Sequence, residues 1–119
     1  MAPDTEAPSE FLMYFPQFKM LDTAEDATHT LHNLYTLRGA QVRDAGNWWK
    51  VLDEALVRYG DKTDIVIAQH HWPKWGNKEI VSYLSNHRDA YKYLNDQTLR
   101  LINKGYTMNE VAEMVKLPE

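Results

Sequence analysis

Side chains that could bind a metal ion or move a proton are concentrated at three places in the chain. They are Glu6 near the acidic start, Glu25 and Asp26 followed by His29 and His32, and the adjacent pair His70 and His71. Zinc sites in proteins are built from cysteine thiolates, imidazoles and carboxylates. Because the chain has no cysteine, a zinc site in it would use imidazole and carboxylate ligands alone.

The carboxylates also have ordinary structural explanations. Glu6 lies in Thr5-Glu6-Ala7-Pro8, where the commoner role of an acid is to face solvent from a loop. Glu25 and Asp26 precede a helical pattern, and acids at that position favour the positive end of the helix dipole. The carboxylates alone therefore do not distinguish a metal site from capping and solvation.

The same holds for the histidines. His29 and His32 are three residues apart, so on a helix they would share a face and could chelate a metal, although such a pair more often packs or faces solvent. His70 and His71 directly follow an apolar strand pattern, and ligands gather at strand ends in α/β sheets. Adjacent strand residues point to opposite faces, so at most one of them is expected to bind a given metal.

Complete catalytic motifs are absent from the sequence. There is no His-x-His-x-Asp-His run, no His-Glu-x-x-His, no glycine-rich phosphate loop and no Gly-x-Ser-x-Gly elbow. From the residues alone, the set Glu6, Glu25 and His70 amounts to part of a metal site rather than a whole one.

Apolar spacing predicts the elements that must position these residues in the first part of the chain. Residues 11–15 and 18–21 are two short apolar runs around Pro16-Gln17 and predict a hairpin. Residues 27–38 and 47–59 have apolar residues at steps of three and four, and a glycine follows each segment, so both are predicted as helices. The continuous apolar run within residues 64–69 is typical of a strand covered on both faces.

The character of the sequence changes after Gly76, and helices are predicted from there on. A long helix is expected over residues 78–104, with Asn77 as N-cap and Gly105 at its C-terminal end. Its apolar seam repeats almost as a heptad, which suits helix packing within the chain or across a dimer. Thr107 and Glu110 match a capping box that would open a short final helix. The boundary near Gly76 divides a mixed α/β part from an all-helical part.

Composition and charge exclude some classes of function. With 44% hydrophobic and 25% charged residues, the 119-residue chain has the composition of a globular domain. Its net charge of -4 and scattered basic residues argue against nucleic-acid binding. No apolar run approaches the roughly 18 residues of a membrane span, and the N-terminus lacks the pattern of a signal peptide.

Several uncommon strings in this sequence occur together, and they carry a family resemblance. They are Thr5-Glu6-Ala7-Pro8, Thr28-His29-Thr30-Leu31-His32-Asn33-Leu34-Tyr35-Thr36-Leu37-Arg38-Gly39-Ala40, Val42-Arg43-Asp44, His70-His71-Trp72-Pro73-Lys74-Trp75-Gly76 and Asp96-Gln97-Thr98-Leu99-Arg100-Leu101. Taken together, the chain resembles the alkyl sulfatases, which are metallo-β-lactamase-fold enzymes that hydrolyse detergents such as dodecyl sulfate. The resemblance runs through essentially the whole chain, in order.

The resemblance implies a fold and a domain arrangement. Residues 1–76 would be the C-terminal portion of the metallo-β-lactamase-like catalytic domain, with a short hairpin, helices and one strand. Residues 77–119 would begin the helical dimerisation domain, so the fold class is α/β followed by all-α, in an internal fragment of a longer enzyme. The parent is expected to form a homodimer, and a periplasmic or secreted location is expected for a bacterial parent.

The resemblance also implies a site. Such enzymes hold two zinc ions (Zn2+), and Glu6, Glu25 and His70 would be ligands, with the remaining ligands in an upstream motif that this chain lacks. Which glutamate bridges the ions is left open. Asn33 and Arg38 would hold the sulfate group of an alkyl sulfate, as suits an amide donor and a planar guanidinium. With part of the ligand set absent, the chain alone is expected to be inactive.

Two other interpretations remain open at this stage. The chain could be a stand-alone helical protein–protein interaction module, with residues 77–119 pairing with another chain and the first part as scaffold. It could also derive from an enzyme of the same superfamily that cleaves a different sulfate or phosphate ester. Convergence of Glu6, Glu25 and His70 on one point in space would favour the enzyme over the interaction module.

Overall fold

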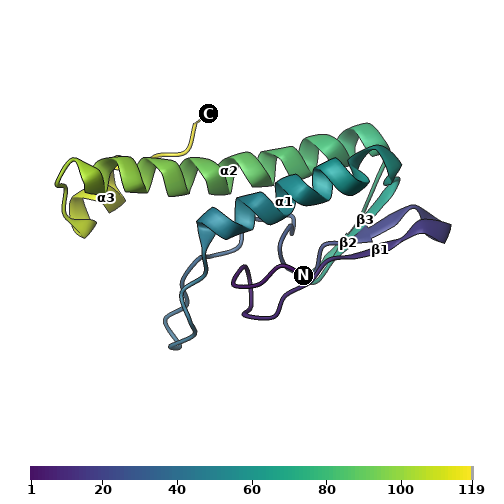
Figure 1. The fold of residues 1–119 in the computed structure, drawn as a ribbon, viewed down its shortest axis with the longest axis horizontal. Helices are drawn as coiled ribbons and strands as arrows, with labels where there is room; N and C mark the ends of the chain where they lie inside the picture. Colours follow the sequence, from purple (N-terminus) through teal and green to yellow (C-terminus); the bar gives the residue numbers. More distant parts are fainter. Residues whose placement is uncertain (119) are drawn as a thin grey trace.

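Two neighbouring helices run along one side of a short four-stranded sheet in the computed structural model, which describes residues 1–118 (Figure 1). The strands are β1 (Met13–Phe15), β2 (Met20–Asp22), β3 (Ile65–Ala68) and β4 (His71–Trp75), and the helices are α1 (Ala45–Tyr59), α2 (Asn77–Asn103) and α3 (Met108–Met114). The molecule is elongated, 50 × 30 × 22 Å, because α2 extends past the beginning of α1 (Figure 1). The chain is therefore a mixed α/β unit with a helical extension.

The sheet has the order β1-β2-β3-β4 and contains one parallel pair. β1 and β2 are antiparallel and form the predicted hairpin, β2 and β3 are parallel, and β3 and β4 are antiparallel. The parallel pair requires a crossover, and α1 lies within it. The carboxyl ends of the two central strands, β2 and β3, consequently lie next to each other at the same end of the sheet.

The strand predictions are partly confirmed. The strand predicted within residues 64–69 is β3, but only Val66 in it is fully buried, so the sheet is not covered on both faces there. β4 was not predicted, and the expectation of a single strand after the hairpin is wrong. Its sequence includes Pro73, which lacks an N–H, and a strand at the edge of a sheet tolerates this residue.

The core lies between the sheet and the two long helices. α1 buries Trp48, Leu52 and Ala55, which are spaced at four and three residues on one face. The Trp48 ring stacks on the ring of Tyr91 from α2, with ring centroids 4.4 Å apart. The predicted helix over residues 47–59 is confirmed. It begins at Ala45 because the side chain of Asp44 accepts the N–H of Asn47 as an N-cap.

The long helix is confirmed with almost the predicted bounds. Asn77 does not cap it. Gly76 is the N-cap, and the Asn77 amide instead donates to the carbonyl oxygens of Gly60 (2.6 Å) and Thr63 (2.8 Å). At the other end, Gly105 has a φ of 90°, which ends the helix as predicted. The capping box of Thr107 and Glu110 opens α3. No helix within residues 1–118 is both long and apolar enough to cross a membrane.

The helix predicted over residues 27–38 does not form, and this segment is an irregular loop. Backbone carbonyl groups in this segment, and that of Asp26 just before it, accept hydrogen bonds from side chains of distant elements instead of from the next turn of a helix. The Trp48 indole donates to Asp26 O (2.9 Å), the Tyr83 hydroxyl to Ala27 O (2.7 Å) and the Tyr91 hydroxyl to His32 O (3.1 Å). Tertiary contacts therefore outweigh the weak helical preference of the segment.

Candidate functional site

The loops after β2 and β3 form the candidate site. Glu25 follows β2 closely and His70 follows β3, so the parallel pairing of these strands brings both residues to one edge of the sheet. The Gln69 N–H donates to Ala24 O (3.1 Å) and ties the two loops together. Ala24 has a φ of 48° and His70 a φ of 73°. Such left-handed backbone is uncommon for residues with a Cβ atom and recurs at functional sites.

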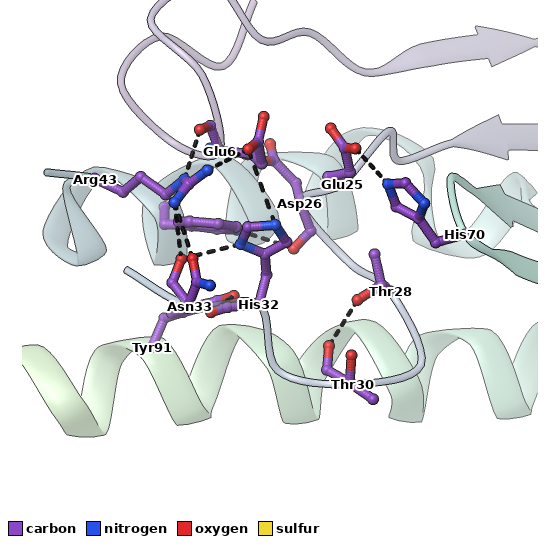
Figure 2. A network of polar contacts seen from close by, with 11 residues as sticks. Glu6, Glu25, Asp26, Thr28, Thr30, His32, Asn33, Arg43, His70 and Tyr91 are labelled. Carbon is purple, nitrogen blue, oxygen red and sulfur yellow. Dashed lines mark hydrogen bonds and ion pairs between the residues drawn. The ribbon is translucent and has the colours of Figure 1, made fainter. Parts of the chain in front are cut away.

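Glu25 and His70 are in direct contact. The His70 Nε2 atom lies 2.7 Å from Glu25 Oε1, although the residues are 45 positions apart in sequence (Figure 2). The His70 side chain is 68% exposed and that of Glu25 is 26% exposed. The pair therefore sits at the surface, with the imidazole open to a ligand from the solvent side.

Three carboxylates gather at this edge. Glu6, Glu10 and Glu25 each offer an oxygen, and these oxygens lie within 4.8 Å of one another. Burial raises the pKa of the Glu10 carboxyl, and the negative charges of Glu25 and Glu6 raise it further. Like charges this close repel unless a cation is shared among them, which makes the cluster a candidate cation site.

Glu10 was missed in the sequence, where it is a single acid before an apolar run. The signal that identifies it is spatial. Its backbone pairs with Ala2, so the N-terminal loop turns back and brings Glu6 and Glu10 to the same place. No spacing rule within residues 1–10 indicates this.

Asp26 lies beneath the cluster and is wholly buried. Its Oδ1 accepts the Glu6 N–H at 3.4 Å, and its Oδ2 has no hydrogen-bond partner among the described residues. Burial raises the pKa of the Asp26 carboxyl to about 7. The interpretation of this residue as a helix-dipole acid is wrong, because no helix begins there.

The two predicted sulfate-binding residues are placed differently. Asn33 lies in the loop over residues 27–38, and the Arg43 guanidinium contacts both Asn33 and Glu6 (Figure 2). Arg38 is exposed, in the turn over residues 37–39. That turn is at the tip of the loop that projects away from the sheet (Figure 1). The structure therefore brings Asn33 towards the carboxylates but does not bring Arg38 there.

The remaining histidines do not form a chelating pair. His29 stacks on His71 with ring centroids 4.7 Å apart, whereas the Nε2 of His32 lies 3.9 Å from Glu6 Oε1. They diverge because the predicted helical face does not exist. Burial lowers the pKa of His29, and nearby His71 adds to this effect. Of the predicted ligands, Glu6 and Glu25 lie in the carboxylate cluster, and His70 contacts Glu25 but is not part of that cluster. Sequence reasoning did not assign Glu10, Asp26 and Arg43 to a site, and each of them contacts or adjoins Glu6.

Comparison with known proteins supports the family resemblance. No family model matches the chain. A linear primary-alkylsulfatase from Pseudomonas sp. is 58% identical over 118 residues, which is 99% of this chain and 18% of that protein. An alkyl/aryl-sulfatase from Saccharomyces cerevisiae is 53% identical over 118 residues, again 99% of this chain and 18% of the relative.

Solved structures agree with these similarities. A stereoselective inverting sec-alkylsulfatase from Pseudomonas sp. superposes with a TM-score of 0.96 at 49% identity, covering 99% of this chain and 19% of that one. The resemblance to alkyl sulfatases is thus confirmed in sequence and in fold. The chain spans about a fifth of the length of the curated relatives it matches.

Proposed function

We propose that this chain supplies Glu6, Glu25 and His70 to the zinc centre of an alkylsulfatase, an enzyme that converts an alkyl sulfate such as dodecyl sulfate and water into an alcohol and hydrogen sulfate. The observation that carries the proposal is the contact of His70 Nε2 with Glu25 Oε1 at 2.7 Å, beside carboxylate oxygens within 4.8 Å of each other.

The donor set fits zinc. Zinc binds imidazole nitrogen and carboxylate oxygen at about 2.0–2.2 Å, so two ligands of one tetrahedral ion lie about 3.4 Å apart. His70 Nε2 lies 2.7 Å from Glu25 Oε1, and the oxygens of Glu6, Glu10 and Glu25 lie within 4.8 Å of one another, so both sets of atoms are close enough to share ions after small side-chain adjustments. By resemblance, two ions are bound and further ligands come from outside these 119 residues. This chain alone is therefore expected to bind zinc weakly and to be inactive.

The chain's own residues would hold the substrate as well as the metal. The Asn33 amide is held by Arg43, which also contacts Glu6, and from this position it can donate to an oxygen of the sulfate group. Arg38 would offer a fork of donors to the same group, once its loop is packed against the rest of the enzyme. The chemistry that two zinc ions supply at such a centre is activation of water and stabilisation of charge on the departing ester oxygen.

The second part of the chain supports an assembly role beside catalysis. Leu99, Ile102, Met108 and Met114 are all more than two-fifths exposed on α2 and α3. Exposed apolar side chains in such numbers are typical of a surface that packs against more protein. We assign residues 77–119 to the beginning of a helical dimerisation domain, after a catalytic portion of metallo-β-lactamase type. A pure interaction module would have no use for the cluster of Glu6, Glu10 and Glu25 with His70 in contact with Glu25.

A graft tests the proposed function. This chain would replace the matching segment of the 49% identical sec-alkylsulfatase, and release of sulfate from a secondary alkyl sulfate would be measured. We expect a graft that hydrolyses the ester and binds zinc, with both lost in Glu25→Gln and His70→Gln. His71→Gln, which changes the neighbouring imidazole, is the matched control and should stay active. A folded graft without activity, or active Glu25→Gln and His70→Gln variants, would contradict the proposal.

A further inference from the structure

Arg43 is the most enclosed basic side chain near the candidate site, at 7% exposed. Its backbone is fixed by its neighbours. Asp44 caps α1, the Asp44 N–H donates to Asp4 O (2.8 Å), and the Arg43 N–H donates to Leu34 O (3.0 Å). The residue thus joins the start of α1 to the N-terminal loop and to the loop that carries Asn33.

The guanidinium of Arg43 reaches two proposed site residues at once. Nε donates to the backbone oxygen of Glu6 at 2.6 Å, and Nη2 donates to Glu6 Oε1. Nη1 donates to Asn33 Oδ1 at 2.9 Å and to Asn33 O at 3.4 Å (Figure 2). Four contacts on two residues use the fork of donors that only arginine provides.

The contacts with Arg43 determine which atoms of Glu6 and Asn33 are left free to bind a ligand. Glu6 Oε1 is engaged by Arg43, so Oε2 is the oxygen left for a cation. A guanidinium has donors only, so the amide atom of Asn33 that faces it must be the oxygen. The Asn33 Nδ2 group is then left as a donor, which is what an anionic sulfate requires.

We propose that Arg43 is a positioning residue for both halves of the site: it presents one oxygen of Glu6 to the metal and turns the Asn33 amide so that Nδ2 meets the sulfate group. This inference rests on the proposed function. A purely structural ion pair would need only the contact with Glu6. Arg43 also fixes the orientation of the Asn33 amide, although Asn33 is exposed to solvent. A fixed amide in that place suits recognition of the sulfate group.

Arg43→Lys separates positioning from folding. Lysine keeps the positive charge next to Glu6 but is a single point donor, so it cannot hold Glu6 and Asn33 together. Arg58→Lys is the matched control, because Arg58 pairs with Glu54 on the exposed face of α1. Folding of each variant would be checked by thermal unfolding in chelator.

Zinc calorimetry on the 119-residue chain is the first readout. Hydrogen-bond partners of metal ligands typically contribute about 10- to 100-fold in affinity, so we expect Arg43→Lys to raise the zinc Kd by about that factor. Arg58→Lys should leave it unchanged. In the sec-alkylsulfatase graft, Arg43→Lys should raise KM for the alkyl sulfate, and this rise should disappear in an Asn33→Ala background.

The outcomes separate the two levels of the proposal. Suppose that the unmodified chain binds zinc and the graft hydrolyses the ester. If a folded Arg43→Lys variant then has the same zinc Kd in the chain and the same KM in the graft as the unmodified proteins, only the positioning role is overturned. The positioning role also fails if the rise in KM persists without Asn33. If neither the chain nor the graft binds zinc or hydrolyses ester, the proposed function fails and the inference fails with it.

Discussion

His70 Nε2 and Glu25 Oε1 meet at 2.7 Å because β2 and β3 are parallel neighbours whose following loops are tied by the Gln69–Ala24 hydrogen bond. Neither loop alone would present a metal site. Both depend on a residue with positive φ, Ala24 before Glu25 and His70 itself. The contact is therefore a product of sheet topology and local backbone strain together.

Removing this pair should abolish zinc binding by the chain. We expect calorimetry to detect weak zinc binding to the unmodified protein and none to the Glu25→Ala, His70→Ala double variant, because only Glu6 and Glu10 of the carboxylate cluster would remain. His71→Ala, which alters the adjacent ring that stacks on His29, is the control and should bind as the unmodified chain does. Equal binding in the double variant would place the metal elsewhere.

The sequence predicted correctly those elements whose local spacing of apolar residues determines their structure. α1 and α2 were predicted to within two residues because apolar side chains such as Trp48 and Leu52 recur on one face. Residues 27–38 show the same kind of spacing, but their backbone carbonyls bond to Tyr83 and Tyr91, and that of Asp26 just before them bonds to Trp48. Those partners lie too far away in sequence for a local pattern to reveal them.

The site was predictable only in part for a similar reason. Glu6, Glu25 and His70 were identified by family resemblance, and their types suit zinc. Glu10 and Arg43 carry no chemical pattern in sequence, since one is a lone acid and the other a lone base before a helix. Their role depends on the N-terminal loop returning to the sheet edge.

The tyrosines of α2 should hold the loop over residues 27–38. Tyr91→Phe removes the hydroxyl that donates to His32 O, and Tyr83→Phe removes one of the two hydroxyls that donate to Ala27 O, the other being that of Thr23. We expect each to lower the free energy of unfolding by about 1 kcal/mol and to speed amide exchange in the loop. Urea unfolding and hydrogen exchange measure these effects. Tyr35→Phe, at an exposed position of the same loop, should change neither quantity.

The final helix should be separable from the site. Thr107→Ala removes the hydroxyl of the capping box, whereas the backbone N–H at position 107 can still donate to Glu110. Loss of an N-cap costs about 1 kcal/mol, so α3 should fray, as faster amide exchange within Met108–Met114 would show. Zinc affinity should not change. Thr107→Ser should restore protection, and reduced zinc binding in Thr107→Ala would instead couple α3 to the site.

Asp26 gives the metal-free chain a distinctive dependence on pH. Burial raises the pKa of this carboxyl from 3.8 to about 7 in the folded protein, so the folded state binds more protons than the unfolded state between those values. By linkage, the free energy of unfolding should fall as pH rises from about 4 to about 7 and then level off. A difference of that size corresponds to about 4 kcal/mol.

Asp26→Asn tests this dependence, because the amide keeps the shape of the side chain and cannot ionise. Urea unfolding in chelator at several pH values should show the variant gaining stability over the unmodified chain as pH rises through this window. Asp96→Asn provides a control of opposite sign, since the hydrogen bond from Lys92 lowers the pKa of Asp96. The contribution of ionised Asp96 to the stability of the folded state is lost as pH falls. Parallel pH profiles for Asp26→Asn and the unmodified chain would mean that Asp26 ionises normally and that its Oδ2 has a partner in solution.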